Sequence, residues 1–237
     1  MPWRRYSRYG KRGYSSSRQK APFRRWRTNG GAGAARSLVC YRPFKQETKY
    51  KDTTLIAAEV CYDDVNFYRT TDINTGSGQG QRIANAITKR ALRLNYCIVA
   101  NSGSTHGAVI RVMVVEDRHC NKTALTSAQL GAALLTDPTT ADAIISPAIP
   151  ENYSRFKIWY DMQHMISPAT GGDLGAVPHT VVIKMGTTSV YTGTTCSDAS
   201  TMTEGCVYIW VTSNVASSDT TNKPAWSGIA RLTYNDA

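Results

Sequence analysis

Residues 92–98, Leu-Arg-Leu-Asn-Tyr-Cys-Ile, alternate apolar and polar side chains without a break. Successive side chains of a β-strand point to opposite faces, so Leu92, Leu94, Tyr96 and Ile98 would share one face. This alternation is typical of a strand with one face in a core and the other in solvent. The segment therefore predicts a half-buried strand. The fold assignment depends on this two-residue alternation.

The same period recurs along the chain. In residues 155–162 the apolar face is Phe156, Ile158, Tyr160 and Met162, and residues 181–185 and 207–211 repeat the alternation. Turn segments rich in Gly, Asn, Ser and Thr separate the runs. Eight or nine short strands with such turns favour an all-β sandwich or barrel over an α/β fold. The remaining strand candidates are 55–62, 82–90, 109–116, 189–192 and 228–234.

One helix is expected, over residues 126–135. Thr126 is a good N-cap, and Gln129 stands three residues later, which is the capping-box spacing. Asp137-Pro138 follows and predicts the end of the helix. The sequence thus indicates one β domain with a short helix in a loop.

Length and composition limit the classes of protein to which the chain can belong. The chain has 237 residues, of which 41% are hydrophobic, enough to form a core. No apolar run approaches the roughly 18–20 residues of a membrane span, so no membrane association is expected. The first residues, Met-Pro-Trp and then arginines, contain no apolar leader, so no secretion is expected either.

The charge of the chain is concentrated at its N-terminus. Residues 1–46 hold 13 Lys and Arg and no acid, which leaves 15 basic and 17 acidic residues, a net −2, for residues 47–237. This asymmetry predicts two parts: a basic N-terminal arm and hinge over 1–46, and a globular domain over 47–237. Gly and Ser runs and the density of like charge predict that the arm is disordered in the free chain.

The arm interleaves cations with aromatic rings, a composition suited to single-stranded nucleic acid. Lys and Arg displace counterions from phosphates, and exposed rings stack on unpaired bases. The same charges also fit a nuclear-localisation signal. The residues expected to bind nucleic acid are Arg4, Arg5, Arg8, Lys11, Arg12, Arg18, Lys20, Arg24, Arg25, Arg27, Trp3, Tyr6, Tyr9, Tyr14 and Trp26.

Three large aromatic residues stand on the predicted solvent face of their strands: Trp159, Tyr208 and Trp210. Burial in a contact between copies of the chain is one explanation. Cover by the long loops of the same chain is the other, and the sequence leaves both open. The three residues are therefore candidate interface positions.

The sequence contains no pattern typical of an enzyme. The four histidines form no His-Glu-x-x-His motif, and no Gly-x-Ser-x-Gly elbow is present. No catalytic, cofactor-binding or metal-binding residue is assigned. An alternative to a structural role is a cellular nucleic-acid chaperone with a β-sandwich body, but the net charge of −2 on the body does not favour it.

Four segments, taken in order, resemble the coat proteins of circular single-stranded DNA viruses that encode a replication initiator, the circovirus-like and geminivirus-like group. They are the arm opening Trp-Arg-Arg-Tyr-Ser-Arg-Tyr at 3–9, Gly-Gln-Gly-Gln-Arg-Ile-Ala-Asn-Ala-Ile at 78–87, the strand 109–118, and Arg-Phe-Lys-Ile-Trp-Tyr-Asp at 155–161. Residues 231–236 add a weaker match. Ala84 departs from the glycine that the family often has.

The resemblance implies a fold and a function. The fold would be a single eight-stranded jelly-roll sandwich, and about 60 copies would form an icosahedral shell. The arm would face a packaged single-stranded DNA genome inside the virion. The protein would enter the host nucleus, through an import receptor, for assembly. No cofactor is implied.

Overall fold

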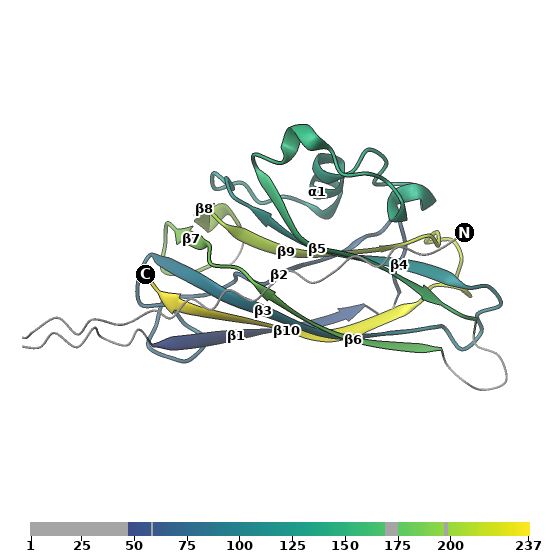
Figure 1. Cartoon of the computed structure of the whole chain (residues 1–237), viewed down its shortest axis with the longest axis horizontal. Helices are drawn as coiled ribbons and strands as arrows, with labels where there is room; N and C mark the ends of the chain where they lie inside the picture. Colours follow the sequence, from purple (N-terminus) through teal and green to yellow (C-terminus); the bar gives the residue numbers. More distant parts are fainter. Residues whose placement is uncertain (1–46, 58, 169–174, 197–198) are drawn as a thin grey trace, which may run out of the picture. The chain divides into compact units, whose positions relative to one another are not determined.

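The computed structural model describes residues 47–57, 59–168, 175–196 and 199–237. The basic arm, 1–46, lies outside the described residues. Within the described part, two antiparallel sheets pack face to face, and one α-helix lies on the outside of the second sheet (Figure 1). The strands are β1 (Thr48–Ala57), β2 (Asn66–Arg69), β3 (Ala86–Val99), β4 (Ala108–Asp117), β5 (Phe156–Ile166), β6 (Ala176–Lys184), β7 (Thr188–Tyr191), β8 (Met202–Glu204), β9 (Cys206–Ser213) and β10 (Ala225–Asp236).

The strand order is that of a jelly roll. In sheet one, β1 pairs with β10, β10 with β3, and β3 with β6. In sheet two the order is β2-β9-β4-β5. When the short β7 and β8 are set aside, the eight remaining strands in chain order form sheets 1-8-3-6 and 2-7-4-5. Consecutive strands alternate between the sheets except for β4 and β5, which pair within sheet two, and this is the order of a jelly roll.

The predicted all-β jelly roll with one helix is confirmed, and so is the alternation that led to it. Leu92, Leu94, Tyr96 and Ile98 all lie buried on the inner face of β3. They face the inner side of β9, where Val207, Ile209 and Val211 are also buried. The core is the layer of side chains between the two sheets.

Several predicted strand bounds are wrong, mostly where a bulge or a buried charge interrupts the alternation. The predicted segment 82–90 begins four residues before β3, and its residues 86–90 belong to the same strand as 92–98; the pairing of β3 with β10 shifts register between Lys89 and Ala91. The prediction 55–62 begins too late, because Lys49 is buried at the start of β1. The half-buried β2 was not predicted.

Strand β5 departs from its predicted apolar face for a related reason. Val114 pairs with Tyr160 and Val115 with Ile158, so Trp159 is the extra residue of a bulge. The faces change sides across a bulge. Consequently Phe156 is buried, whereas Met162 is 41% exposed.

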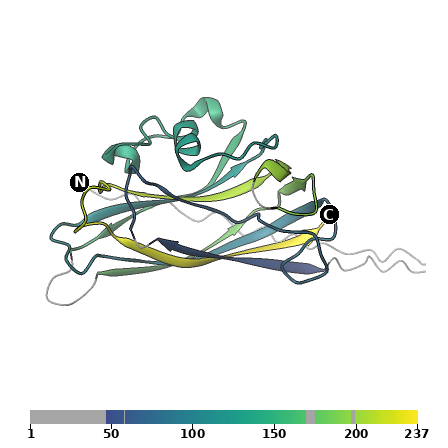
Figure 2. The ribbon, with the colours of Figure 1, turned by 180° about the vertical axis from the view of Figure 1, so that it is seen from behind.

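The helix α1 (Ser127–Leu134) begins and ends close to the predicted bounds. The Gln129 amide donates to Thr126 Oγ1 at 3.2 Å, and the Thr126 amide donates to Gln129 Oε1 at 3.0 Å. These two bonds form the predicted capping box. The helix belongs to an excursion, residues 118–155, which also contains the 3₁₀ turns Ala141–Ile144 and Pro150–Asn152 and lies over the outer face of sheet two (Figure 2).

Candidate nucleic-acid and assembly surfaces

Two of the three outward-facing aromatic residues are buried within the single chain. Tyr208 and Trp210 are 1% and 0% exposed in the single chain. Trp210 lies under α1, where a Cβ placed on Gly131 would come within 3.6 Å of its ring. Tyr208 stacks on Phe67, with ring centroids 4.8 Å apart. Cover by the chain's own loops accounts for both side chains, so neither is free to touch a second copy.

Trp159 differs from them, because it is only partly buried and its polar edge is anchored. Its indole N–H donates to Glu116 Oε2 at 2.7 Å. The Lys157 ammonium lies 3.4 Å from the centroid of its ring. The indole is thus held in one orientation at the surface of sheet two, and Trp159 stays a candidate for a contact between copies.

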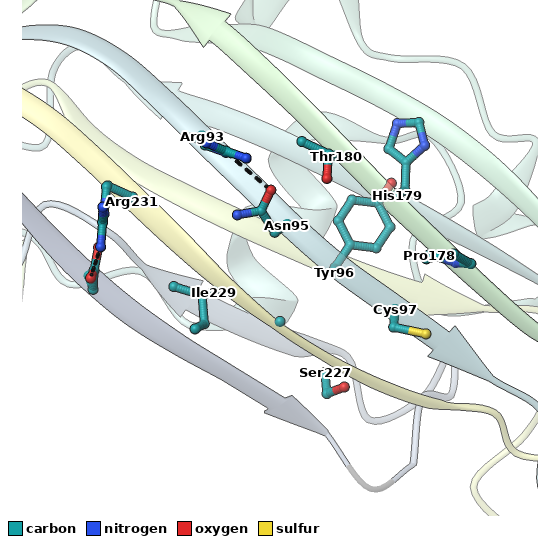
Figure 3. Close-up of a pocket in the computed structure, with 12 residues that line it drawn as sticks. Arg93, Asn95, Tyr96, Cys97, Pro178, His179, Thr180, Ser227, Ile229 and Arg231 are labelled. Carbon is teal, nitrogen blue, oxygen red and sulfur yellow. Dashed lines mark hydrogen bonds and ion pairs between the residues drawn. The ribbon is translucent and has the colours of Figure 1, made fainter.

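No described segment covers the outer face of sheet one (Figure 1). Its centre is hollowed into a shallow cavity of about 700 Å³, with Asn95, Thr180 and Ser227 on its floor (Figure 3). Arg93 and Arg231 stand opposite each other on β3 and β10. The lining combines polar side chains such as these with apolar ones, Ile229 and Pro178 among them.

The charge of this face is partly neutralised. Arg231 donates two hydrogen bonds to Asp52, each 2.7 Å long, and these bonds hold the pKa of that carboxyl below its usual range. Arg93 Nε donates to Asn95 Oδ1 at 3.3 Å. Lys184 adds a further cation on β6. Arg93, Arg231 and Lys184 thus place cations on this face, and Asp52 pairs with one of them.

A buried ion pair joins the two sheets at the end of the sandwich where β3 and β9 begin. Lys89 Nζ, which is 0% exposed, lies 2.8 Å from Glu116 Oε1. It also donates to Ser189 Oγ at 2.8 Å and to the Gly205 carbonyl at 2.7 Å. Burial alone raises the pKa of Glu116, but the Lys89 charge and its hydrogen bond bring the net value below the ordinary one. Burial lowers the pKa of Lys89, and the Glu116 charge opposes that shift, so each charge of the pair depends on the other.

Two further arginine–carboxylate pairs hold the ends of the excursion. Arg155 donates to both oxygens of Asp117, at 3.1 and 2.8 Å. Arg111 donates to both oxygens of Asp161, at 2.8 and 2.6 Å, and its guanidinium also bonds carbonyls of the 3₁₀ region. These bidentate pairs are strong and geometrically specific. The contacts give both arginines structural roles.

A histidine and tyrosine cluster spans the gap between the free edges of the sheets, at β5 and β6. The Tyr96 hydroxyl lies 2.6 Å from His164 Nε2 and 3.0 Å from the Tyr160 hydroxyl. The rings of His164 and His179 are 5.1 Å apart. Burial, and after it the proximity of His179, lowers the pKa of His164.

This lowered pKa predicts acid sensitivity. A histidine whose pKa is depressed in the fold binds protons more readily when unfolded, so stability falls as pH drops below about 6.5. The loss from His164 should not exceed about 1.4 kcal/mol per pH unit. Urea unfolding between about pH 7 and pH 5 measures it. His164→Gln keeps an acceptor for Tyr96 and should flatten the profile; an unchanged profile in that variant would contradict the prediction.

Among the described residues, no group of three His, Cys, Asp or Glu side chains is arranged to hold a metal ion. In the same part of the chain, neither α1 nor any other helical segment has the length and apolar character of a membrane span.

No protein-family model and no curated protein matches the chain. Solved structures that are similar to it at low identity include the following three. The KBV activated particle at acidic pH is 12% identical with a TM-score of 0.33, over 92% of this chain and 88% of that one. The infectious bursal disease virus VP2 subviral particle is 12% identical with a TM-score of 0.24, over 79% of this chain but only 33% of that one. The deformed wing virus carrying the GFP gene is 13% identical with a TM-score of 0.24, over 92% and 89%. The fold assignment rests on the strand order given above.

Proposed function

We propose that the chain is a viral coat protein that assembles into a small icosahedral shell and packages single-stranded DNA through its basic arm. The observation that carries the proposal is the combination of a complete jelly roll with an N-terminal segment of 13 cations and no acid. A body with a net charge of −2 leaves the arm as the strong polyanion site. The choice of DNA over RNA rests on the sequence resemblance alone.

Contacts between copies need surfaces on several sides of the body, because a closed shell surrounds each subunit with neighbours. Large apolar side chains are exposed on different parts of the described fold: Ile56 on β1, Met165 on β5, Ile83 before β3 and Ile145 in the excursion. With Trp159 they supply candidate contact residues on both sheets. This distribution suits a subunit that is buried on several sides in its assembly.

Assembly should be coupled to cargo. About 60 arms in one cavity would bring together roughly 800 positive charges, which repel one another unless a polyanion neutralises them. Filled shells should therefore be more stable than empty ones. The arginine-rich arm would also serve nuclear import before assembly.

Electron microscopy of the purified chain tests the proposal. Closed particles of uniform diameter, formed with single-stranded DNA, are the expected result. Monomers or dimers that bind nucleic acid without closing would favour the alternative, a cellular nucleic-acid chaperone. Chains that neither assemble nor bind nucleic acid would contradict both.

A further inference from the structure

A small cavity lies where β4 ends and β5 begins. Its volume is about 310 Å³, and its lining residues are Arg118, Tyr153, Phe156, Lys157 and Ile158. Ligand pockets start at about 300 Å³, so the cavity suits one small group rather than a large molecule. Neither the arm nor the candidate interface positions account for it.

Two of the residues that line the cavity, Arg118 and Lys157, are cations. Glu116 is paired with Lys89 and also accepts from Trp159, and Asp117 is paired with Arg155. Both acids at this strand end are therefore already engaged. Neither the Arg118 guanidinium nor the Lys157 ammonium forms an ion pair with an acid in the described part of the chain.

The position of the lysine charge is fixed by the layer below it. The Lys157 ammonium rests 3.4 Å above the centroid of the Trp159 ring, and Glu116 holds that ring through its indole N–H. The backbone amide of Arg118 donates to the Arg155 carbonyl at 2.9 Å, which fixes the start of the excursion. The lysine charge held in this way is prepared to bind an anion, since little of its ordering remains to be done, whereas Arg118 is fixed through its backbone and supplies the second cation of the lining.

The other side chains that line the cavity indicate which kind of molecule carries the anion. Tyr153 is 52% exposed, and Phe156 and Ile158 form an apolar wall. The only acceptor among the lining side chains is the Tyr153 hydroxyl. Sugar hydroxyls need several acceptors, whereas a flat ring needs only an exposed aromatic face. The lining therefore fits a planar ring that carries a phosphate better than it fits a sulfated sugar.

We propose that this cavity binds one nucleotide of a single-stranded nucleic acid, with its phosphate between Arg118 and Lys157 and its base stacked on Tyr153. The proposal rests on the proposed function, because it gives the body a second contact with the polymer that the arm holds. The position of the cavity in the fold agrees with this proposal. The described body begins at residue 47. Thr48, at the start of β1, pairs with Asn235 of β10. Asn235 lies beside the start of β3, the strand that carries Lys89. Lys89 bonds Glu116, so the first described residues of the body lie at the end of the sandwich that holds the cavity.

Photocrosslinking of the full chain tests the assignment. A single strand of about eight nucleotides with photoreactive 5-iodouracil is irradiated with the protein, and adducts are located by mass spectrometry. We expect adducts on the arm and a separate adduct at Tyr153. In the variant carrying Arg118→Ala and Lys157→Ala, the Tyr153 adduct should fall about fivefold or more, with the arm adducts retained.

A matched control removes the same two charges elsewhere. Arg93→Ala with Lys184→Ala takes one arginine and one lysine from the outer face of sheet one and should leave the Tyr153 adduct unchanged. Circular dichroism checks that both variants are folded. Equal losses in the two variants, or no loss in the first, would overturn the pocket and indicate a general effect of charge.

The remaining outcomes separate the pocket from the function. Arm adducts without any adduct at Tyr153 would overturn the pocket and leave the proposed function standing. An absence of all adducts would overturn both. If a sulfated oligosaccharide bound the wild type but not the Arg118→Ala, Lys157→Ala variant, and no nucleotide adduct formed at Tyr153, the nucleotide assignment would be wrong.

Discussion

Lys89→Met should lower the free energy of unfolding by about 3–5 kcal/mol, because it leaves the Glu116 carboxylate buried without its partner. The two side chains are 0% and 2% exposed, so water cannot replace the lost ammonium. The same change removes the donors to Ser189 and Gly205, which tie the β7–β8 region to the sandwich. Urea unfolding of the full chain at neutral pH measures the loss.

Two controls show whether burial of the charge is the cause. Arg231→Ala breaks the pair with Asp52, whose members are 49% and 40% exposed, and should cost less than about 1 kcal/mol. Adding Glu116→Gln to Lys89→Met removes the stranded charge and should restore part of the stability. A cost for Lys89→Met no larger than that for Arg231→Ala would contradict this account of the ion pair.

Deletion of residues 2–36 should remove most of the affinity for single-stranded DNA, by about 10³-fold at low salt. The deleted segment carries eleven of the thirteen cations that precede residue 47. Because the arm's affinity comes from counterion release, log affinity of the full chain should fall steeply with log salt, and the slope should become shallow in the deletion. Fluorescence anisotropy of a labelled strand measures both quantities. Full affinity in the truncated chain at about 0.15 M salt would mean that the arm is not the binding site.

The aromatic rings of the arm supply a control that leaves its charge intact. Changing Trp3, Tyr6, Tyr9, Tyr14 and Trp26 to Leu should weaken single-stranded binding more than duplex binding, since only unpaired bases can stack. Equal losses on both substrates would indicate that the rings pack on protein. The arm deletion should weaken both substrates, because both carry phosphates.

The parts of the fold that could be predicted are those fixed by local patterns. The alternation of residues 92–98 and the Thr126 and Gln129 capping box each depend on neighbours close in sequence. The jelly-roll order itself came from the resemblance, since periodicity gives strands but not their partners. The bulges near Lys89 and at Trp159 hid part of the pattern, because an extra residue changes the face of every residue after it.

The candidate sites were harder to predict, since they depend on contacts between distant segments. Glu116 and Asp117 are adjacent acids in the sequence, and only the fold shows that each has a cation from a segment far away in the chain. Tyr208 and Trp210 were correctly placed on the outer face of their strand, but the segments that cover them, β2 for Tyr208 and α1 for Trp210, come from far away in the chain. The only sign of the small cavity in the sequence was the presence of three cations, Arg118, Arg155 and Lys157, at the predicted strand ends. No local pattern showed which of these cations has no acidic partner.

The most direct test of the central claim is sedimentation velocity of the full chain, recorded at two wavelengths that separate protein from nucleic acid. With single-stranded DNA the account predicts one fast species of uniform size that contains both components, and closed particles in the same fraction by electron microscopy. The chain lacking residues 2–36 should give no fast species that carries DNA. Wild-type chains that stay monomeric at every salt concentration and pH, with and without DNA, would contradict the coat-protein proposal.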